Sequence, residues 1–368
     1  MRKSTAYLAA TVYTGNSTLH HQALIVKDGF IEDSIPAVSL QKDLYELVDF
    51  GEAILAPAFM DIQLYGAYDR LLAIYPDAET VAAIYQYSKA GGAAYCMPTV
   101  ATNAYETIFK CIDAVRDYWK QGGKGVLGLH AEGPWINPVK KGAHIEALIF
   151  SPTLAQAKEL VDYGKDVLKM ITLAPEVCSN EVIDYLLKQD ILLSAGHSNA
   201  TYEQANESFK KGIPAATHLF NAMSAFQHRA PGLAGAVLDH AIVKAPIIPD
   251  GHHVDYAAIR IAKKIMGDRL FVITDAVTET PEGLYPHQLD GDKYVSNGIL
   301  SGSALTMGKA VQNLVQHTGI DVAEALRMCS LYPARLLKKS DEFGLLKKGY
   351  RAEFVVLDQA LNVLQTIA

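Results

Sequence analysis

The chain has 368 residues, half of them apolar, with a formal net charge of −7 and a pI near 5.9. This length and composition allow one large core or two ordinary ones. The acidic balance argues against general binding to nucleic acid or to anionic membranes, because like charges repel. Small molecules or other proteins are the expected partners.

Residues 1–53 predict one part of a small β-domain. The segments LAATVYT and ALIVKDGFIEDS alternate polar with apolar residues or turn at Asp-Gly, as β-hairpins do. Residues 336–368, with the run GYRAEFVVLD, have the same pattern. Neither piece alone has enough apolar faces to form a core, so both termini are expected to meet in one small β-sandwich domain.

Residues 54–335 predict an α/β fold, a (β/α)₈ TIM-type barrel. Eight short apolar runs recur, with helical patterns such as AETVAAIYQYSKAGG and TYEQANESFKKG between several of them; the runs are AILAPAFMDI, AAYCMPT, GVLGLHAEG, VLKMITLAPE, ILLSAGHS, AATHLFN, VKAPIIPDG and RLFVITDA. Eight such units between about Ala53 and Pro333 favour a closed barrel over an open, doubly wound sheet, because this span is close to the roughly 250 residues typical of the barrel.

The N-terminal residues, the hydropathy of the chain and its cysteines together indicate a cytoplasmic protein without a signal peptide or membrane anchor. The basic N-terminus precedes only a short, interrupted apolar run, and no apolar stretch approaches membrane-spanning length. Four cysteines are far apart in the sequence, form no C-x-x-C pair and lie mostly in apolar surroundings, as reduced core thiols do: Cys96, Cys111, Cys178 and Cys329.

Four predicted strands end in residues that bind metals or transfer protons. Because a barrel places its active site at the C-terminal strand ends, Glu132, His197, His218 and Asp275 are expected to converge. Each alone could be structural, as a hydrogen-bonded histidine or a turn cap. Together at four strand ends of one barrel they predict a metal site with a proton-transfer acid.

One carboxylate and two neutral imidazoles suit a borderline divalent ion, with Zn²⁺ first and Fe²⁺, Co²⁺ or Mn²⁺ as alternatives. Three protein ligands leave a position for a water molecule, whose pKa a bound ion brings down to about 7. Asp275 would then accept a proton from the attacking water and deliver it to a leaving nitrogen.

The first barrel strand ends at Gln63 and Tyr65, where many metal-dependent hydrolases carry a His-x-His pair. An amide is a poor ligand for a borderline metal, although Gln63 could contact a water molecule or a substrate group. We therefore expect one metal ion per chain instead of two.

Several motifs resemble the N-acetylglucosamine-6-phosphate deacetylase family of the amidohydrolase superfamily, and the resemblance covers nearly the whole chain. They are LHAEGPWINPVKKGAH, LSAGHSNATYEQA, THLFNAM, RAPGLAGAVLD, DGHHVDY, ITDA, LSGSALTMGKAVQNLV and SLYPAR. The resemblance implies hydrolysis of the acetamide of N-acetylglucosamine 6-phosphate to glucosamine 6-phosphate and acetate.

The resemblance also implies roles for individual residues. It makes Glu132, His197 and His218 the metal ligands, Asp275 the general base and acid, and His144 a group that polarises the amide carbonyl. Sugar and phosphate contacts are implied for Ala143, His144, Asn221, Ala222, Arg229, His253, Leu300, Ser301 and Gly302. In this family the arginine reaches the neighbouring subunit's site, so a homodimer is expected.

Other interpretations remain at this point. The substrate could be another N-acetylhexosamine phosphate, such as N-acetylgalactosamine 6-phosphate, or the protein could bind a sugar phosphate without catalysis. Cyclic-amide hydrolases of the dihydropyrimidinase type, and deaminases, are disfavoured because His-x-His is missing and because Lys169 lies at the wrong end of the fourth strand for a bridging ligand. The segment 276–299 is expected to be either a mobile lid or an ordinary hairpin.

Overall fold

The computed structural model describes residues 3–281 and 283–368, which divide into two compact units. One unit contains the chain up to Asp61 together with Ser88–Tyr95 and Thr306–Ala368. The other contains Ile62–Tyr87 and Cys96–Leu305. Both ends of the chain therefore belong to the same unit.

The first unit is built on a mixed seven-stranded sheet in the order β20-β19-β5-β1-β2-β3, with β4 beside β1. Strand β1 is parallel to β4 and β5, whereas β19 is antiparallel to β5. Leu24, Leu55 and Phe354 are fully buried in its core. The predicted second domain from both termini is confirmed as this sheet, whose strands are β1 (Thr5–Tyr13), β2 (Thr18–Lys27), β3 (Phe30–Pro36), β4 (Glu46–Asp49), β5 (Ile54–Pro57), β19 (Phe354–Leu357) and β20 (Val363–Ile367).

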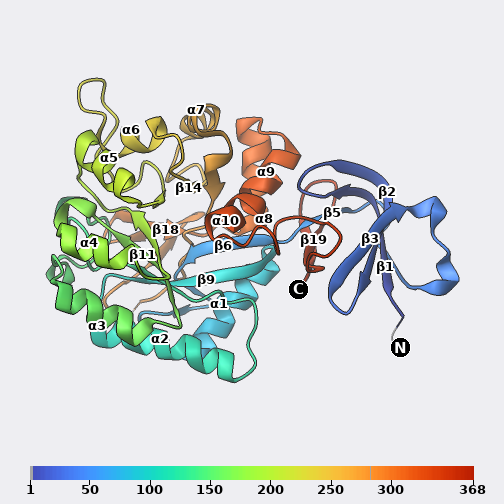
Figure 1. Ribbon diagram of the computed structural model, residues 1–368, viewed down its shortest axis with the longest axis horizontal. Helices are drawn as coiled ribbons and strands as arrows, with labels where there is room; N and C mark the ends of the chain where they lie inside the picture. Colours follow the sequence, from blue (N-terminus) through green and yellow to red (C-terminus); the bar gives the residue numbers. More distant parts are fainter. Residues whose placement is uncertain (1–2, 282) are drawn as a thin grey trace. The chain divides into compact units, whose positions relative to one another are not determined.

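Each of the eight predicted apolar runs contributes to one strand of a parallel barrel (Figure 1), and the first run also contains β5 of the other sheet. Six of them pair in the order β13-β12-β11-β10-β9-β6, and β14 pairs with β15. A bridge between Ala215 and Lys244 continues the ring, and the amide N–H of Asp275 donates to the carbonyl of Gln63 at 3.0 Å to close it. The strands are β6 (Phe59–Leu64), β9 (Ala93–Ala101), β10 (Leu129–Glu132), β11 (Leu168–Leu173), β12 (Leu192–Ala195), β13 (Ala215–Ala216), β14 (Ala245–Ile247) and β15 (Leu270–Val272).

The strands are buried on both faces, as expected for a parallel sheet that is covered by helices. In Figure 1 helices α2–α6 run along the outside of these strands. Capping boxes begin α3 at Thr153 and α5 at Thr201, where each hydroxyl accepts an amide proton of the first helical turn. The α-helices from α1 to α7 are α1 (Ala78–Ala90), α2 (Tyr105–Lys120), α3 (Leu154–Gly164), α4 (Asn180–Leu186), α5 (Tyr202–Lys211), α6 (Gly232–Asp239) and α7 (Tyr256–Met266).

Smaller elements complete the fold. An antiparallel sheet follows the last barrel strand, formed by β16 (Gln288–Asp290), β17 (Lys293–Ser296) and β18 (Ile299–Ser303). Strands β7 (Gly66–Ala67) and β8 (Arg70–Leu71) pair after β6, and the first unit adds α8 (Met307–Asn313), α9 (Val322–Cys329) and α10 (Leu331–Leu336). Within the described residues, every helix is too short or too polar to cross a bilayer.

Candidate active site

A cavity lies at the C-terminal ends of the barrel strands. It has an empty volume of about 870 Å³, including open solvent, and all of its lining residues belong to the second unit. Twelve of the predicted site residues line it: Glu132, Ala143, His144, His197, His218, Asn221, Ala222, His253, Asp275, Leu300, Ser301 and Gly302. Two others do not, since Gln63 lies buried behind the lining and Arg229 lies exposed on a surface loop.

Two parts of the lining differ in their origin. The strand-end wall comprises residues that follow or end barrel strands: Tyr65, Glu132, His197, His218 and Asp275. The hairpin wall comes from the segment 283–303: Tyr285, His287, Leu300, Ser301 and Gly302. The segment 276–299, predicted as a lid or a hairpin, contains antiparallel strands, and its residues Val277, Tyr285 and His287, which precede these strands, line the cavity. Its residue 282 lies outside the described residues.

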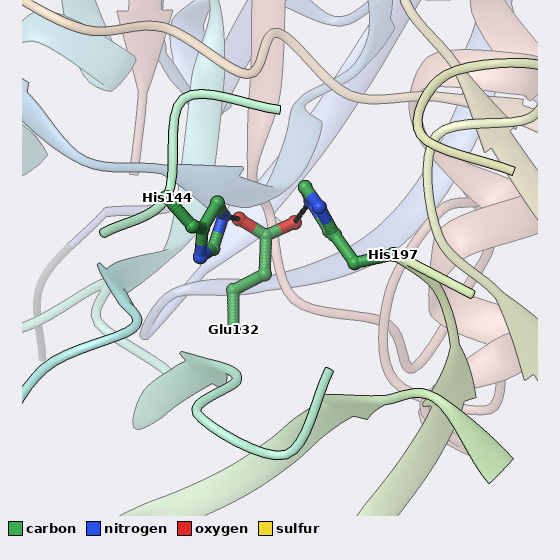
Figure 2. A group of neighbouring side chains, drawn as sticks. All are labelled: Glu132, His144 and His197. Atoms are coloured by element: carbon green, nitrogen blue, oxygen red, sulfur yellow. Dashed lines mark hydrogen bonds and ion pairs between the residues drawn. The ribbon is translucent and has the colours of Figure 1, made fainter. Parts of the chain in front are cut away.

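Glu132 is the last residue of β10, and its carboxylate is almost completely buried. Its Oε1 faces two imidazoles, with Nε2 of His218 at 3.1 Å and Nε2 of His197 at 3.3 Å. Its Oε2 accepts a hydrogen bond from the hydroxyl of Tyr65 and lies 3.2 Å from Nε2 of His144. Figure 2 shows His144 and His197 on opposite sides of this carboxylate.

His197 and His218 both present the lone pair of Nε2 to the cavity. Nδ1 of His197 donates to the carbonyl of Lys140 at 2.9 Å, and Nδ1 of His218 donates to that of Asn221 at 3.1 Å. These bonds select the tautomer with an unprotonated Nε2. The two Nε2 atoms lie 3.1 Å apart beside Oε1 of Glu132, so three lone pairs converge, which is the donor set a borderline divalent cation requires.

His144 has the opposite tautomer. Its Nδ1 lies 3.3 Å from the amide nitrogen of Thr102 and 2.6 Å from that residue's hydroxyl. Because an amide N–H can only donate, Nδ1 is the acceptor and Nε2 carries the proton that faces Glu132. Ligand atoms of Glu132, His144 and His197 also lie within 4.8 Å of one another, but the hydrogen-bonded tautomer makes His144 a donor and favours His218 as the third ligand.

The ionisation of the cluster follows from burial and mutual contacts. Burial alone would raise the pKa of Glu132, but the neighbouring imidazoles, His197 first, hold that pKa well below its usual value. Burial, together with the charge of His197, lowers the pKa of His144 to about 4. At neutral pH the arrangement is therefore an ionised carboxylate beside a neutral His144 that donates from Nε2.

Asp275 is held by its backbone and its side chain. Its N–H donates to the carbonyl of Gln63 at 3.0 Å, and its own carbonyl accepts from the N–H of Ser303 at 3.0 Å. Its Oδ1 accepts from Nε2 of Gln63 at 2.8 Å. Burial, with a further contribution from the charge of Glu132, raises the pKa of the Asp275 carboxyl group, and a higher pKa makes the carboxylate a stronger base.

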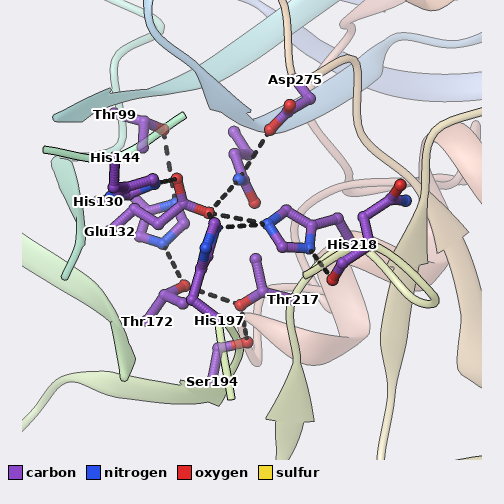
Figure 3. Close-up of polar contacts among 12 residues, drawn as sticks. Thr99, His130, Glu132, His144, Thr172, Ser194, His197, Thr217, His218 and Asp275 are labelled. Carbon is purple, nitrogen blue, oxygen red and sulfur yellow. Dashed lines mark hydrogen bonds and ion pairs between the residues drawn. The ribbon is translucent and has the colours of Figure 1, made fainter. Parts of the chain in front are cut away.

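A layer of hydroxyl groups lies beneath the cluster (Figure 3). His130 contacts the hydroxyl of Thr172 at 2.8 Å, which in turn contacts that of Thr217 at 2.7 Å. Ser194 completes the layer at 2.6 Å from Thr217. Since these side chains come from four neighbouring strands, they fix the strand ends that carry Glu132, His197 and His218.

Other residues of the cavity lining carry groups suited to a polar substrate. Nδ1 of His253 lies 2.6 Å from Oδ2 of Asp250, so Nδ1 donates to this carboxylate and Nε2 is the ring nitrogen left for a ligand. On the hairpin wall, Nδ1 of His287 contacts the hydroxyl of Ser301 at 2.9 Å. The ring of Tyr285 stacks on that of His287 and meets His144 edge to face.

The sequence reasoning did not assign roles to Tyr65, Tyr285 or His287. Tyr65 carried a usable signal, because residues 63 and 65 of one strand point to the same face and Gln63 was already a candidate. Tyr285 and His287 carried none, since they lie in an irregular segment whose path depends on distant contacts.

A (β/α)₈ barrel with a carboxylate, two imidazoles and an aspartate at its strand ends defines a metal-dependent hydrolase. The family model described as "Amidohydrolase family" matches residues 54–368, and the chain belongs to this family of metal-dependent amide hydrolases. The predicted superfamily is therefore confirmed.

Individual relatives resemble the chain over almost its full length. N-acetylglucosamine-6-phosphate deacetylase from Haemophilus influenzae is 34% identical over 98% of this chain and 97% of its own. N-acetylgalactosamine-6-phosphate deacetylase from Escherichia coli O157:H7 is 32% identical over 97% of this chain and 96% of its own. A mutant N-acetyl-D-glucosamine-6-phosphate deacetylase from Mycobacterium smegmatis, solved in complex with N-acetyl-D-glucosamine-6-phosphate, superposes with a TM-score of 0.90 at 27% identity, covering 100% of this chain and 98% of its own.

Proposed function

We propose that the protein hydrolyses the acetamide of N-acetylglucosamine 6-phosphate to glucosamine 6-phosphate and acetate. One observation carries this proposal: three converging lone pairs, a buried aspartate and an Nε2–H donor share one cavity. The relatives from Haemophilus influenzae and Mycobacterium smegmatis support this substrate. The aspartate separates the proposal from simple sugar-phosphate binding, which needs no proton-transfer group at this position.

Oε1 of Glu132 and Nε2 of His197 and His218 would hold one divalent ion, Zn²⁺ first by donor chemistry and Fe²⁺, Co²⁺ or Mn²⁺ as alternatives. When bound, the ion would supply Lewis-acid polarisation of the amide carbonyl and an acidified water molecule. The backbone carbonyls of Lys140 and Asn221 keep both imidazoles in the ligating tautomer.

The proton transfers are assigned to side chains of the strand-end region. Asp275 accepts a proton from the attacking water and passes it to the nitrogen of the acetamide, which leaves as the amine of glucosamine 6-phosphate. His144 donates its Nε2–H to the carbonyl oxygen as that oxygen gains negative charge. Its neutral state at working pH suits a hydrogen-bond donor that must not lose its proton.

The phosphate is assigned to Nε2 of His253, to the backbone of Asn221 and Ala222, and to Arg229 from a second subunit. Arg229 lies on an exposed loop outside this chain's own cavity, which supports a role across a homodimer interface. A guanidinium can meet two phosphate oxygens at once. Because the four cysteines are buried thiols, we place the reaction in the reducing cytoplasm.

The direct test is acetate release from N-acetylglucosamine 6-phosphate by the metal-loaded protein. Asp275→Asn should lower kcat by about 10³-fold while leaving the metal content unchanged, because it removes proton transfer alone. Asp162→Asn, at an exposed position on α3, is the matched control and should behave as wild type. No acetate from wild type, or an Asp275→Asn variant as active as wild type, would exclude the proposed reaction.

A substrate panel should resolve which sugar phosphate is used. The Escherichia coli relative makes N-acetylgalactosamine 6-phosphate the second candidate, and it differs from the first only at C4. Removing the phosphate from the substrate should cost about 10²-fold in kcat/KM, since remote binding energy of a few kcal/mol appears in this ratio. Arg229→Ala should cause a similar loss with the phosphorylated substrate and almost none with the unphosphorylated one.

A further inference from the structure

We propose that Tyr65 is a positioning residue for the metal ligand Glu132: its hydroxyl group binds Oε2, orients the carboxylate so that Oε1 faces the ion, and prevents a second ion from binding at Oε2. This inference rests on the proposed function for its chemistry. It concerns a residue that neither touches the reacting atoms in the steps above nor belongs to the three ligands. It also gives a physical reason why this cavity would hold one ion.

Tyr65 is fixed where it can act only on Glu132 and its neighbours. It follows β6 directly, and the residue is 8% exposed. Its N–H donates to the carbonyl of Ala276 at 2.8 Å, and its carbonyl accepts from the N–H of Leu72 at 3.0 Å. With the backbone held on both sides, the ring has little freedom to leave the cavity.

The hydrogen bonds around the phenol determine where its single proton goes. Nε2 of Gln63 donates to the Tyr65 oxygen at 2.8 Å, so one lone pair of that oxygen is already used. Two carboxylates remain as acceptors, and Glu132 is much closer than Oδ1 of Asp275 at 3.4 Å. The proton therefore belongs to the bond with Oε2 of Glu132.

The two carboxylate oxygens of Glu132 thus contact different groups. Oε1 faces the unprotonated nitrogens of His197 and His218, and it also lies 2.9 Å from Nε2 of Gln63, whose two hydrogens are shared among Glu132, Tyr65 and Asp275. Oε2 faces two donors, the hydroxyl of Tyr65 and the Nε2–H of His144. A cation can join the two imidazole lone pairs beside Oε1, whereas the described partners of Oε2 are both donors, and the closer of them is the hydroxyl of Tyr65.

Removal of the hydroxyl group tests this division. In Tyr65→Phe the ring remains, but Oε2 keeps only the longer contact to His144, and the carboxylate can rotate or chelate through both oxygens. Loss of a partner that orients a ligand typically costs about 10-fold to 100-fold in metal affinity. We expect this loss in a chelator competition titration, with KM for the sugar phosphate within about 2-fold of wild type because Tyr65 holds the ligand and not the sugar.

Tyr118→Phe is the matched control, since this tyrosine is also 8% exposed and its hydroxyl donates to a backbone carbonyl, that of Lys124, outside the cavity. Its metal affinity should equal that of wild type. Wild-type metal affinity in Tyr65→Phe would overturn the inference. Thermal unfolding of both variants shows whether they fold.

A second variant keeps the inference testable if Tyr65→Phe does not fold. The double change Gln63→His and Tyr65→His places two imidazoles where the donors to Glu132 now lie, so it should raise the metal content from one to two ions per chain by elemental analysis. A count that stays at one would contradict the blocking role of Tyr65. These measurements do not depend on acetate release, so loss of the proposed reaction and loss of this inference give different results.

Discussion

The strand-end wall and the hairpin wall enclose the same cavity but are built by opposite means. Each residue of the first wall follows or ends a barrel strand, and Asp275 is tied through its backbone to Gln63 on one side and Ser303 on the other. The second wall combines residues of β18 with Tyr285 and His287, which precede β16, in a segment whose strands pair with one another. The barrel therefore positions the groups assigned to chemistry, whereas the insertion shapes the space for the substrate.

This difference separates two kinds of mutational effect. Changes in the strand-end wall should alter metal binding and kcat, because these groups meet the ion or the reacting atoms in the proposed reaction. Changes in the hairpin wall should alter stability and the choice of substrate, because its polar groups face the cavity from a segment outside the barrel.

The strongest test compares two histidines next to Glu132. His218→Ala should lower metal affinity by more than about 100-fold, since a lost ligand costs more than a lost partner of a ligand. His144→Ala should keep metal affinity within about 10-fold but lower kcat by about 10²-fold to 10³-fold through loss of its hydrogen-bond donor. Metal titration and acetate release measure the two effects, and the reverse pattern would assign the third ligand to His144.

The next test uses pH and the hairpin wall. Burial lowers the pKa of His287 to about 4, whereas an unfolded histidine titrates near 6.5. Between these two pKa values the unfolded state therefore binds more protons than the folded state. The free energy of unfolding consequently falls as the pH is lowered from about 6.5 toward about 4. His287→Gln removes this pH-dependent loss. Urea unfolding should therefore show that the free energy of unfolding decreases from pH 7.5 to pH 5 by about 2 kcal/mol more in the wild type than in the variant. Equal decreases in the free energy of unfolding of the two proteins would contradict the lowered pKa of His287.

The smallest expected effect concerns substrate choice. His287→Ala and Ser301→Ala remove a polar pair on the hairpin wall, and each should change kcat/KM by about 10-fold or less, as for one lost hydrogen bond. The change should differ between substrates that differ at C4, with metal affinity as in wild type. An equal loss for every substrate would place these residues outside substrate selection.

The comparison also shows which parts of the site could be predicted from the sequence. Glu132, His197, His218 and Asp275 could be found because parallel strands in one barrel must end at the same rim. The meeting of both terminal segments in one sheet could be predicted because neither segment alone has enough apolar residues to form a core. The partners of His144 could not be found, since Thr102 meets it only after two separate loops pack together.

The backbone at the strand ends has a consequence for selection experiments. His197, His218 and Asp275 have φ values of 47°, 28° and 54°, in the left-handed region that suits glycine better than these residues. Such conformations cost on the order of 1–3 kcal/mol each, and the surrounding structure must supply that free energy. A library of variants that is screened for heat resistance alone should therefore enrich glycine at these positions and lose the proposed enzymatic activity. Thermostable variants would have to be selected with an activity screen in every round.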